Sequence, residues 1–589
     1  MRLGLCILAV LAIATAVASE EVKPKEEPES TQTPLPSDLE EKVEVVEPLP
    51  TGEDPASFQT RLDTEEVGSR GQDLADLFRR VPGARVQDYG GLGSYATLSM
   101  RASTAEQVTV LVDGVPQNRA LGGPVDLSSI PATQVEEINV FRGFGAASLG
   151  LGGVGGLVDI RTKPAGSTHG VQVQADLLGG GYQTGRLAAS LAVPTGESRA
   201  LRFDVEALAT EGNFWFLDTG GTFFNADDDV VRRRENNDIH QTALRFQHAW
   251  ERIGPSQVRV ALNLQDRDRG VPWIDNLPTS TARLENRLAD LTTVWNRRGR
   301  GSTEDLEVVF NAFEADSRFL DENADFGAAT DRTTQMRGAG LAGVWRVSTG
   351  KHNVTTRADG RWEQARVRDA LLVIEDRGGA ERSLLGLTVE DMVSLGRWTV
   401  SPSLRWDLRD DEFIAGGGGT LPPPAEDLSE DALSGKIGVV WAAGPKTNIR
   451  GSIGSFYRAP SLRELFGNRG ALRGNPDLRS ERGRAAEVGV VHGLSRGGFE
   501  TSIEIVGFGR RTEDLIHFRQ QSQGVAVAVN LLDTEVYGVE ALASLSWRNG
   551  VWLDASLTRQ RATDVSGGPF DGQPLIYHPE RLGYAGVRW

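Results

Sequence analysis

Apolar and polar side chains alternate along most of the chain, from about residue 168 to the end. Segments 201–209, 258–265, 499–505 and 551–558 show the pattern clearly, with apolar residues at nearly every second position. Successive side chains of a β-strand point to opposite faces, so the alternation predicts strands with one apolar and one polar face. It fits a membrane-spanning barrel with a polar lumen, and equally a half-buried sheet in a soluble sandwich.

The first residues have the features of a secretory signal peptide. Arg2 supplies a positive start, residues 3–17 are almost wholly apolar, and the Ala-Val-Ala sequence at 16–18 forms a cleavage site before Ser19. The single cysteine of the chain, Cys6, lies in this segment. The mature chain is therefore predicted to hold neither a disulfide nor a thiolate metal site.

The export signal favours the barrel over the soluble sandwich. After the signal peptide, no run of about 18 apolar residues could form a membrane-spanning helix. The alternating segments repeat over most of the chain, and the chain ends on an aromatic residue, Trp589. A closed barrel pairs every backbone polar group inside the lipid and leaves no free strand edge.

Charge and histidine placement exclude several classes of function. The formal net charge of −18 argues against a nucleic-acid partner, because the chain has no basic patch to neutralise phosphates. The seven histidines are scattered and make no zinc-binding or catalytic spacing. No serine, histidine and carboxylate set stands in a recognisable nucleophile context. The chain is therefore not predicted to be an enzyme, and no cofactor is expected.

Gly150, Gly152 and Gly155 form a G-x-G-x-x-G array, the spelling of a dinucleotide-binding turn. Such a turn must open a helix, with the pyrophosphate at the helix N-terminus. Residues 157–162 instead alternate, contain β-branched side chains and stop before a Lys-Pro pair, which predicts a strand. The glycines are therefore interpreted as tight turns with close backbone packing, and a dehydrogenase is not expected.

The segment after the signal peptide has a different composition. Residues 19–60 are rich in Glu, Pro, Thr and Ser, and predict a flexible acidic segment that buries too little surface to fold. One short extended stretch interrupts it, formed by Val43, Glu44, Val45, Val46 and Glu47. Composition alone makes this stretch a chance cluster of β-branched residues.

Residues 61–166 predict a compact α/β unit. Apolar residues at helical spacing predict a helix over 74–81, ended by the Pro-Gly pair at 82–83. A turn is predicted at 113–114. Short strands are predicted over residues 97–101, 108–112, 137–141 and 157–162.

Seven stretches carry motifs in an order found in one protein family. They are 108–118 (VTVLVDGVPQN), 126–131 (DLSSIP), 135–143 (VEEINVFRG), 148–164 (SLGLGGVGGLVDIRTKP), 456–467 (FYRAPSLRELFG), 474–489 (GNPDLRSERGRAAEVG) and 536–541 (VYGVEA). The first four resemble the plug domain of TonB-dependent outer-membrane receptors, and the last three resemble consecutive signatures of that family's barrel. The resemblance covers nearly the whole mature chain.

The resemblance implies an all-β transmembrane barrel of about 22 antiparallel strands, with an N-terminal α/β plug domain in its lumen. It divides the chain into a signal peptide (1–18), a flexible periplasmic segment (19–60), the plug (61–166) and the barrel (167–589). It also implies a monomer in the outer membrane of a Gram-negative cell, with the N-terminal segment in the periplasm.

Receptors of this family import a scarce ligand with energy supplied through TonB, an inner-membrane partner that pairs with an N-terminal box as an added strand. Val43–Glu47 is the candidate box. A ferric siderophore is the preferred ligand, with cobalamin as the alternative, and residues 461–474 lack the histidine expected of a haem receptor. A passive porin or adhesin, which needs no box, is the alternative from another class.

The resemblance also places two plug loops near the outer mouth of the barrel. Their candidate ligand contacts are Tyr89, Gly91, Ser94 and Tyr95 in one loop, and Gln117, Asn118 and Arg119 in the other. The alternative is that both loops are glycine-rich tips that only support the fold. A further outer-loop candidate joins acidic residues 227–229 to basic residues 232–234, and is interpreted as a solvated charge run rather than a cation site.

Ion pairs between plug and barrel are a further implication. Arg101 and Arg142 match plug arginines of the family, and Glu464 and Glu487 are the candidate partners in the barrel. A guanidinium binds a carboxylate through two parallel hydrogen bonds, so such pairs could hold the plug and still yield to force. The alternative is that these are ordinary charges lining the lumen.

Overall fold

The structure is a computed structural model that describes residues 54–64, 73–150, 154–166, 170–219, 225–272, 280–299, 303–326, 328–371, 376–414, 428–467, 472–520, 526–547, 550–568 and 570–589. The expected signal peptide and the candidate box Val43–Glu47 lie outside these residues. Within the described residues, no helix is both long and apolar enough to cross a membrane.

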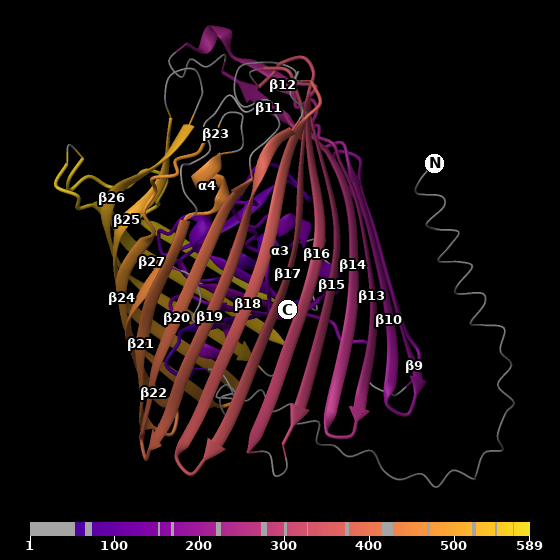
Figure 1. Ribbon diagram of the computed structural model, residues 1–589. Coiled ribbons are helices and arrows are strands. Elements are labelled where there is room, and N and C mark those ends of the chain that lie inside the picture. Colours follow the sequence, from indigo (N-terminus) through magenta and orange to yellow (C-terminus); the bar gives the residue numbers. More distant parts are fainter. Residues whose placement is uncertain are drawn as a thin grey trace, which may run out of the picture. The chain divides into compact units, whose positions relative to one another are not determined.

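The first described part of the chain is an α/β plug inside a ring of strands (Figure 1). Its mixed sheet has the order β1-β6-β7-β4-β5, in which β4 lies parallel to β7, and a separate hairpin pairs β2 with β3. The predicted α/β unit is thereby confirmed. Its elements are β1 (Gln59–Asp63), α3 (Leu74–Phe78), β2 (Ala84–Asp88), β3 (Ala96–Met100), η1 (Ala105–Gln107), β4 (Thr109–Val112), β5 (Val115–Pro116), η2 (Leu127–Ser129), η3 (Ala132–Gln134), β6 (Val135–Phe141), η4 (Ala147–Leu149) and β7 (Leu157–Thr162).

The predicted plug helix forms, but it is shorter than the apolar spacing suggested. Asp73 caps α3 by accepting a hydrogen bond from the backbone N–H of Asp76 at 3.1 Å, and Asp76 completes a reciprocal capping box. Leu74, Leu77 and Phe78 are almost completely buried in the plug core. Because so short a helix is unstable alone, its packing against the sheet must hold it.

The glycine array is followed by a strand, as predicted. Gly150 ends η4 in the left-handed region with φ 86°, and Gly156 precedes β7 with φ 115°. A Cβ at Gly156 would lie 2.5 Å from the carbonyl oxygen of Phe141, so only glycine lets this turn run so close to β6. Residues 157–162 form β7, which pairs with β6 and β4, and not the helix that a dinucleotide-binding turn requires.

The rest of the described chain is a closed barrel, which confirms the predicted fold class. Nineteen strands make up its closed order within the described residues, and one of them, β23, has only two residues. This is fewer than the approximately 22 strands that the family resemblance implied. Strands of up to 22 residues explain the difference, because longer strands divide the same length of chain into fewer crossings.

The barrel strands pair antiparallel with their neighbours along the chain, except that β23 pairs in parallel with β26. They are β8 (Gln172–Gly180), β9 (Thr184–Gly196), β10 (Arg199–Thr210), β13 (Ile239–Ile253), β14 (Ser256–Gly270), β15 (Arg283–Arg298), β16 (Glu304–Asp321), β17 (Thr330–Thr349), β18 (His352–Asp369), β19 (Asp376–Leu395), β20 (Trp398–Ile414), β21 (Leu428–Gly444), β22 (Thr447–Arg458), β23 (Leu472–Arg473), β24 (Glu481–Arg496), β25 (Phe499–Gln520), β26 (Ala526–Trp547), β27 (Val551–Asp564) and β28 (Arg581–Arg588).

The two ends of the barrel differ in the length of their connections. At one end, residues 254–255, 350–351 and 396–397 make tight turns, whereas residues 211–238 and 459–480 connect strands at the other end. Membrane barrels have short periplasmic turns and longer external loops, which gives the orientation. A set of tryptophans near the short-turn ends marks the periplasmic interface, as membrane girdles do: Trp250, Trp295, Trp345, Trp398, Trp441 and Trp547.

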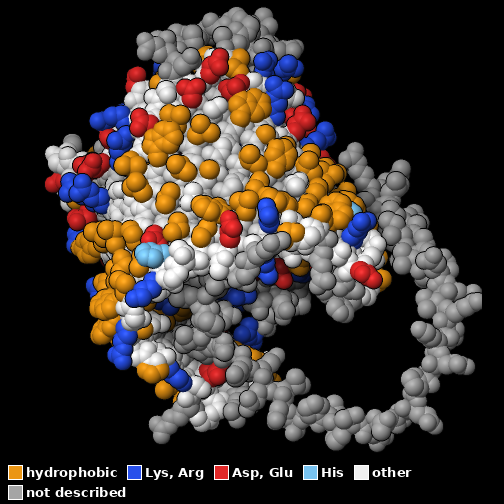
Figure 2. Space-filling model, turned by 60° about the horizontal axis from the view of Figure 1, so that its bottom comes forward, with side chains coloured by type: hydrophobic (Ala, Val, Ile, Leu, Met, Phe, Trp, Pro, Cys, Tyr) orange, Lys and Arg blue, Asp and Glu red, His pale blue; other side chains and the backbone are white. Residues whose placement is uncertain are grey.

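The alternation seen in the sequence separates a lipid-facing wall from a polar lumen. Figure 2 shows hydrophobic side chains spread over the outer wall of the barrel. Leu433 on β21 is 64% exposed, while its neighbour Ser434 is buried. The same reversal occurs on β24, where Glu487 is buried and Val488 is exposed. On β10, one of the segments predicted from alternation, Arg202, Asp204 and Glu206 are buried, which confirms the predicted polar face.

Candidate ligand cavities and plug–barrel interface

A cavity of about 560 Å³ lies between the plug and the lumenal faces of β13 to β17, and we call it the outer cavity. Its barrel residues come from the halves of these strands nearest the long connections, which places it toward the external end. Its charged lining residues are six arginines and four aspartates: Arg119, Arg245, Arg267, Arg269, Arg287, Arg463, Asp113, Asp126, Asp290 and Asp316. The lining is therefore basic, although the chain as a whole is acidic.

Some of these arginines also tie the plug to the barrel wall. Arg267 donates to Asp126 at 2.8 Å, and Arg245 donates to Asp113 at 3.0 Å. Burial alone would raise the pKa of Asp113, but Arg259 and Arg245 outweigh it and hold the pKa below its usual value. Asp113 thus stays ionised as a fixed anchor for the wall arginines.

Arg119 differs from the arginines on the wall. It belongs to the plug, and its guanidinium lies 4.4 Å from the centre of the Phe313 ring of β16. Burial lowers its pKa, and Glu363 and Asp290 only partly oppose this effect. The described part of the chain gives it no carboxylate within ion-pair distance. It is therefore a cation at the plug apex that can accept an anionic partner.

The predicted ligand-contact residues divide into two groups. Tyr95, Gln117 and Arg119 line the outer cavity, whereas Tyr89, Gly91, Ser94 and Asn118 do not. Tyr89 is half exposed, with its ring 5.7 Å from that of Tyr95. The side chain of Asn118 accepts from Val110 N–H and donates to the Val108 carbonyl, both at 2.8 Å. Asn118 therefore braces the plug backbone.

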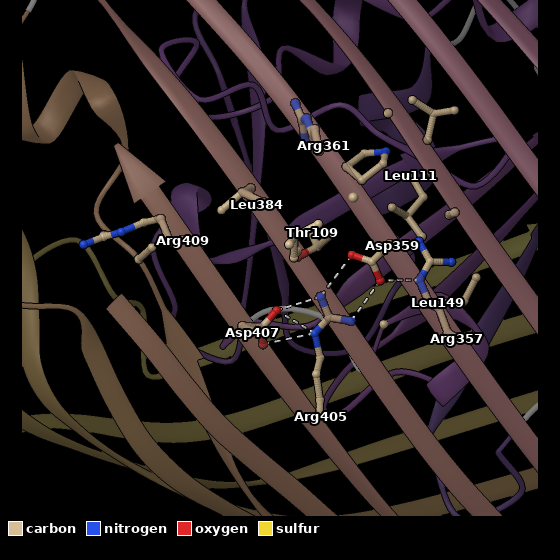
Figure 3. Close-up of a pocket in the computed structure, with 18 of the residues that line it drawn as sticks. Thr109, Leu111, Leu149, Arg357, Asp359, Arg361, Leu384, Arg405, Asp407 and Arg409 are labelled. Carbon is tan, nitrogen blue, oxygen red and sulfur yellow. Dashed lines mark hydrogen bonds and ion pairs between the residues drawn. The ribbon is translucent and has the colours of Figure 1, made fainter. Parts of the chain in front are cut away.

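A second cavity, of about 330 Å³, lies deeper in the lumen between the plug and β16 to β22, and we call it the inner cavity (Figure 3). Its charged lining residues are five arginines and three acidic residues: Arg357, Arg361, Arg405, Arg409, Arg458, Glu106, Asp359 and Asp407. It is basic on balance, like the outer cavity. Leucines of the plug and of β19 contribute apolar surface to the same lining.

An ordered network of charges crosses three strands at this cavity (Figure 3). Arg405 of β20 donates to Asp407 at 2.9 Å and to Asp359 of β18 at 3.0 Å, and Arg357 donates to Asp359 at 2.9 Å. Gly386 of β19 stands in register between the two aspartates. A Cβ there would collide with the Arg405 guanidinium, so the glycine is what lets Arg405 reach across β19.

The plug and barrel also meet in a buried cluster of charges, which we call the ion-pair cluster: Arg101 and Arg142 of the plug with Glu487, Glu504 and Glu540 of the barrel. Arg101 donates to Glu487 at 2.7 Å and to Glu540 at 2.9 Å. Arg142 donates to Glu540 at 2.9 Å and also pairs with Glu504. Burial would lower the pKa of Arg142, but Glu504 and Glu540 raise it, so the guanidinium stays charged.

One of the predicted partners does not belong to this cluster. Glu464 pairs with Arg458 at 3.1 Å and accepts from Ser461 N–H at 2.7 Å, which corrects its assignment as the partner of a plug arginine. Its position explains this, because it completes the capping box of the short external helix α4 (Leu462–Phe466). The sequence analysis missed Glu504 and Glu540, although both lie on the lumenal side of strongly alternating strands.

Residues 54–58, which we call the N-terminal anchor, are packed into the lumen, although the sequence predicted a flexible segment through residue 60. Asp54 accepts from Ala56 N–H at 3.0 Å and from Ser401 Oγ at 3.1 Å, and pairs with Lys436. The side chains of both Asp54 and Lys436 are completely buried. A Cβ on Gly438 of the wall would lie 2.6 Å from that of Ala56, so the anchor lies flush against β21.

The acidic and basic run of the first long external connection forms a hairpin of β11 (Trp215–Asp218) and β12 (Val230–Arg233). Arg232 pairs with Asp218 at 3.0 Å, and Arg233 lies over the ring of Trp215 at 5.0 Å. Within the described residues, no group of three or more histidine, cysteine or acidic side chains could hold a metal ion. The geometry is that of a charged hairpin.

Comparisons with known proteins agree with this arrangement of plug and barrel. A family model described as TonB dependent receptor-like, beta-barrel matches residues 176–589, and the TonB-dependent Receptor Plug Domain matches residues 52–157. The chain belongs to the TonB-dependent receptor family. Receptors of this family are β-barrel proteins of the outer membrane, and they work with TonB on small ligands.

Solved structures support the fold of this receptor. The copper transporter OprC has a TM-score of 0.74 at 15% identity, covering 90% of this chain and 83% of that chain. The iron transporter FrpB of Neisseria meningitidis, F3-3 variant, has a TM-score of 0.71 at 15% identity, covering 91% and 84%. The alcaligin receptor FauA of Bordetella pertussis has a TM-score of 0.66 at 13% identity, covering 91% and 84%. At these identities the similarity concerns the fold alone.

Curated relatives of this receptor carry the name vitamin B12 transporter BtuB. The protein of Vibrio cholerae is 37% identical over 134 residues, which are 23% of this chain and 22% of that protein. The protein of Vibrio vulnificus is 22% identical over 454 residues, 73% of this chain and 64% of that protein. The matches therefore span less than two thirds of these relatives' own length.

Proposed function

We propose that this receptor imports an anionic ferric siderophore, with energy supplied through TonB. The charge of the two cavities is the observation that carries the choice of ligand. Arginines outnumber acidic residues six to four in the outer cavity and five to three in the inner cavity, inside a chain of net charge −18. Chelators that hold Fe³⁺ through several deprotonated oxygens are commonly anionic, and a basic lining attracts such ligands.

Arg119 is the residue proposed to meet the ligand first. Arg119→Ala is expected to weaken binding of a ferric siderophore by about 10- to 100-fold, because a hydrogen bond to a charged group contributes about 1.5–3 kcal/mol. Arg119→Lys keeps the charge and should retain part of the affinity. Binding is measured with radioactive iron chelates on the purified receptor. Arg79→Ala, a half-exposed plug arginine outside the cavity, is the control, and equal affinity of the two alanine variants would contradict the proposed contact.

The candidate box Val43–Glu47 provides the test of energy coupling. Val45→Pro removes a backbone N–H and is expected to abolish uptake while leaving ligand binding unchanged, because proline interrupts strand pairing with TonB. Val45→Ala, which keeps the N–H, is the matched control and should transport normally. Uptake that persists in the proline variant would favour a passive porin or a box at another position.

Cobalamin is the second candidate ligand, because the curated relatives described above carry the name vitamin B12 transporter. Growth of a deletion strain on single ferric chelates or on cobalamin separates the two candidates. Mass spectrometry of ligand retained by the purified receptor identifies the compound directly. Growth restored by cobalamin but by no ferric chelate would replace the siderophore proposal.

A further inference from the structure

The two cavities are neighbours, and lining residues of one meet lining residues of the other in two contacts. In each contact, one residue lines the outer cavity and its partner lines the inner cavity: Arg119 lies over Phe313 at 4.4 Å, and Arg463 donates to Glu106 at 3.2 Å. We call these two pairs the partition. Both outer members are arginines, so an anion in the outer cavity attracts the two side chains that close the way inward.

The partition is held on the side of the outer cavity by α4, which carries Arg463. The backbone N–H of Leu462 donates to the carbonyl of Ala120 at 2.8 Å, which joins α4 to the plug loop that carries Arg119. Glu363 of β18 accepts from the backbone N–H of Ala120 at 2.5 Å. The plug loop is therefore held at one point, and the arginine beside that point is free to change partner.

The inner cavity is bounded on another side by η4 of the plug. Arg357 of the wall donates to the carbonyl of Ser148 at 2.9 Å, and Leu149 and Gly150 line the cavity. The charge network of Arg357 and Arg405 therefore supports this segment of the plug. We call the inner cavity the chamber. The partition lies on one side of it and η4 on another.

The chemistry of the chamber suits an anionic, partly apolar ligand. Arg409 is buried and lines the chamber; Asp411 and Glu430 pair with it at 3.5 Å and 3.2 Å, and its Nη1 has no hydrogen-bond acceptor within the described residues. Buried N–H groups without acceptors are costly, so an incoming oxygen anion would be favoured there. Leu111, Leu149 and Leu384 supply apolar surface. A volume of about 330 Å³ lies at the lower end of the range for small-ligand sites.

We propose that the inner cavity is a second binding site for the imported anion, and that the partition is the gate between the two sites. This rests on the proposed function for the identity of the anion. A cation–π contact contributes about 0.5–2 kcal/mol and an ion pair whose side chains are each 22% exposed about 1 kcal/mol, whereas each bond to an anionic ligand contributes about 1.5–3 kcal/mol. The ligand can therefore displace both arginines from their partners and open the gate.

The test uses a cysteine inside the chamber. The single native cysteine, Cys6, lies in the expected signal peptide, so Ser434→Cys gives the mature receptor one reactive thiol, on the chamber wall. The receptor is reconstituted in vesicles with its external end outward, and the anionic reagent 2-sulfonatoethyl methanethiosulfonate is added outside. Adding Arg119→Ala is expected to raise the labelling rate about tenfold or more, because the gate then stands open in a larger fraction of molecules.

The charge of the chamber gives a second readout. A cationic methanethiosulfonate of similar size is expected to react about tenfold more slowly than the anionic reagent, because basic walls repel it. Leu433→Cys, the next residue on the same strand but on the lipid face, is the matched control and should not respond to Arg119→Ala. Leu384→Cys, at another position in the chamber, replaces Ser434→Cys as the reporter if that variant folds poorly.

Two results would overturn the proposal: labelling that is indifferent to Arg119→Ala at both reporter positions, or a cationic reagent that reacts as fast as the anionic one. Neither measurement uses a siderophore or TonB. A receptor for another ligand would therefore still show the gate, and an error in the proposed ligand would appear only in the growth tests.

Discussion

Replacing Arg142 with alanine is expected to loosen the plug and to raise passive leakage through the barrel. The side chain of Arg142 is completely buried between Glu504 and Glu540, and its loss leaves Arg101 as the one plug cation in the ion-pair cluster. Removing one partner of a buried ion pair typically costs about 3–5 kcal/mol, because a charge is left uncompensated. This loss of free energy weakens the contact between the plug and the barrel wall.

Leakage is measured as the sensitivity of cells to vancomycin, an antibiotic too large for ordinary porins, at matched receptor levels. Thermal unfolding of the purified receptor reports the stability of the plug. Arg79→Ala is the matched control, since Arg79 is 48% exposed and forms plug-surface ion pairs worth at most about 1 kcal/mol. Unchanged permeability in the Arg142 variant would show that the ion-pair cluster does not hold the plug.

Replacing Asp54 with alanine is expected to release the N-terminal anchor. Asp54 and Lys436 are both completely buried, so removing the carboxylate leaves Lys436 without its ion-pair partner in the lumen. A penalty of about 3 kcal/mol corresponds to an increase of about 100-fold in the hydrogen exchange of the β1 amides that follow the anchor. Any force applied to the N-terminal segment meets this anchor before it meets β1, so the variant should also yield at a lower pulling force.

The anchor should also depend on pH. Burial would raise the pKa of Asp54, but the charge and hydrogen bond of Lys436 outweigh burial and lower the pKa below its usual value. The stabilisation is therefore complete at neutral pH, and it is lost as the pH falls below about 4 and through the lowered pKa. Exchange of the β1 amides should rise in this acidic range in the natural receptor, and should lose this pH dependence in Asp54→Ala.

A double replacement provides the control for the anchor. Asp54→Leu together with Lys436→Met removes both charges, and should restore much of the protection, because a buried ion pair can be exchanged for apolar groups at little cost. Asp477→Ala changes an exposed carboxylate in the external connection before β24 and should not affect β1. Equal hydrogen exchange of the β1 amides in Asp54→Ala and in the natural receptor would mean that the anchor does not stabilise β1.

Much of the fold could be predicted from local patterns. Alternation identified segments of β10, β14, β25 and β27 and the lumenal side of each, since side-chain direction in a strand depends only on neighbouring residues. The run after Gly155 was correctly predicted as a strand for the same reason. The number of strands was not predictable in this way, because it depends on how long each strand is when the whole sheet closes. The sequence analysis did not predict that residues 54–58 are packed in place. A polar, proline-rich composition predicts a flexible segment and gives no information about contacts with the distant barrel wall.

The site residues that lie in recognisable sequence motifs could be predicted, and those outside such motifs could not. Arg101 and Arg142 stood in plug motifs, and the structure brings Glu487 to one of them. The roles of Glu504 and Glu540 could not be predicted, because they depend on how the plug is oriented inside the barrel. That orientation brings residues nearly 400 positions apart into one cluster. Glu464 lies in a barrel motif, yet the local geometry of α4 turns it toward Arg458.

The sequence by itself determined that the chain forms strands with one lipid face and one polar face, and that a small α/β domain precedes them. These follow from periodicity, composition and turn chemistry, which act over short stretches of chain. Only the tertiary structure decided which charges meet, that two basic cavities flank the Arg119 loop, and that Asp54 is fixed to the wall. Those features depend on how the plug sits in the barrel, and no local pattern of residues encodes the contact between two surfaces so far apart along the chain.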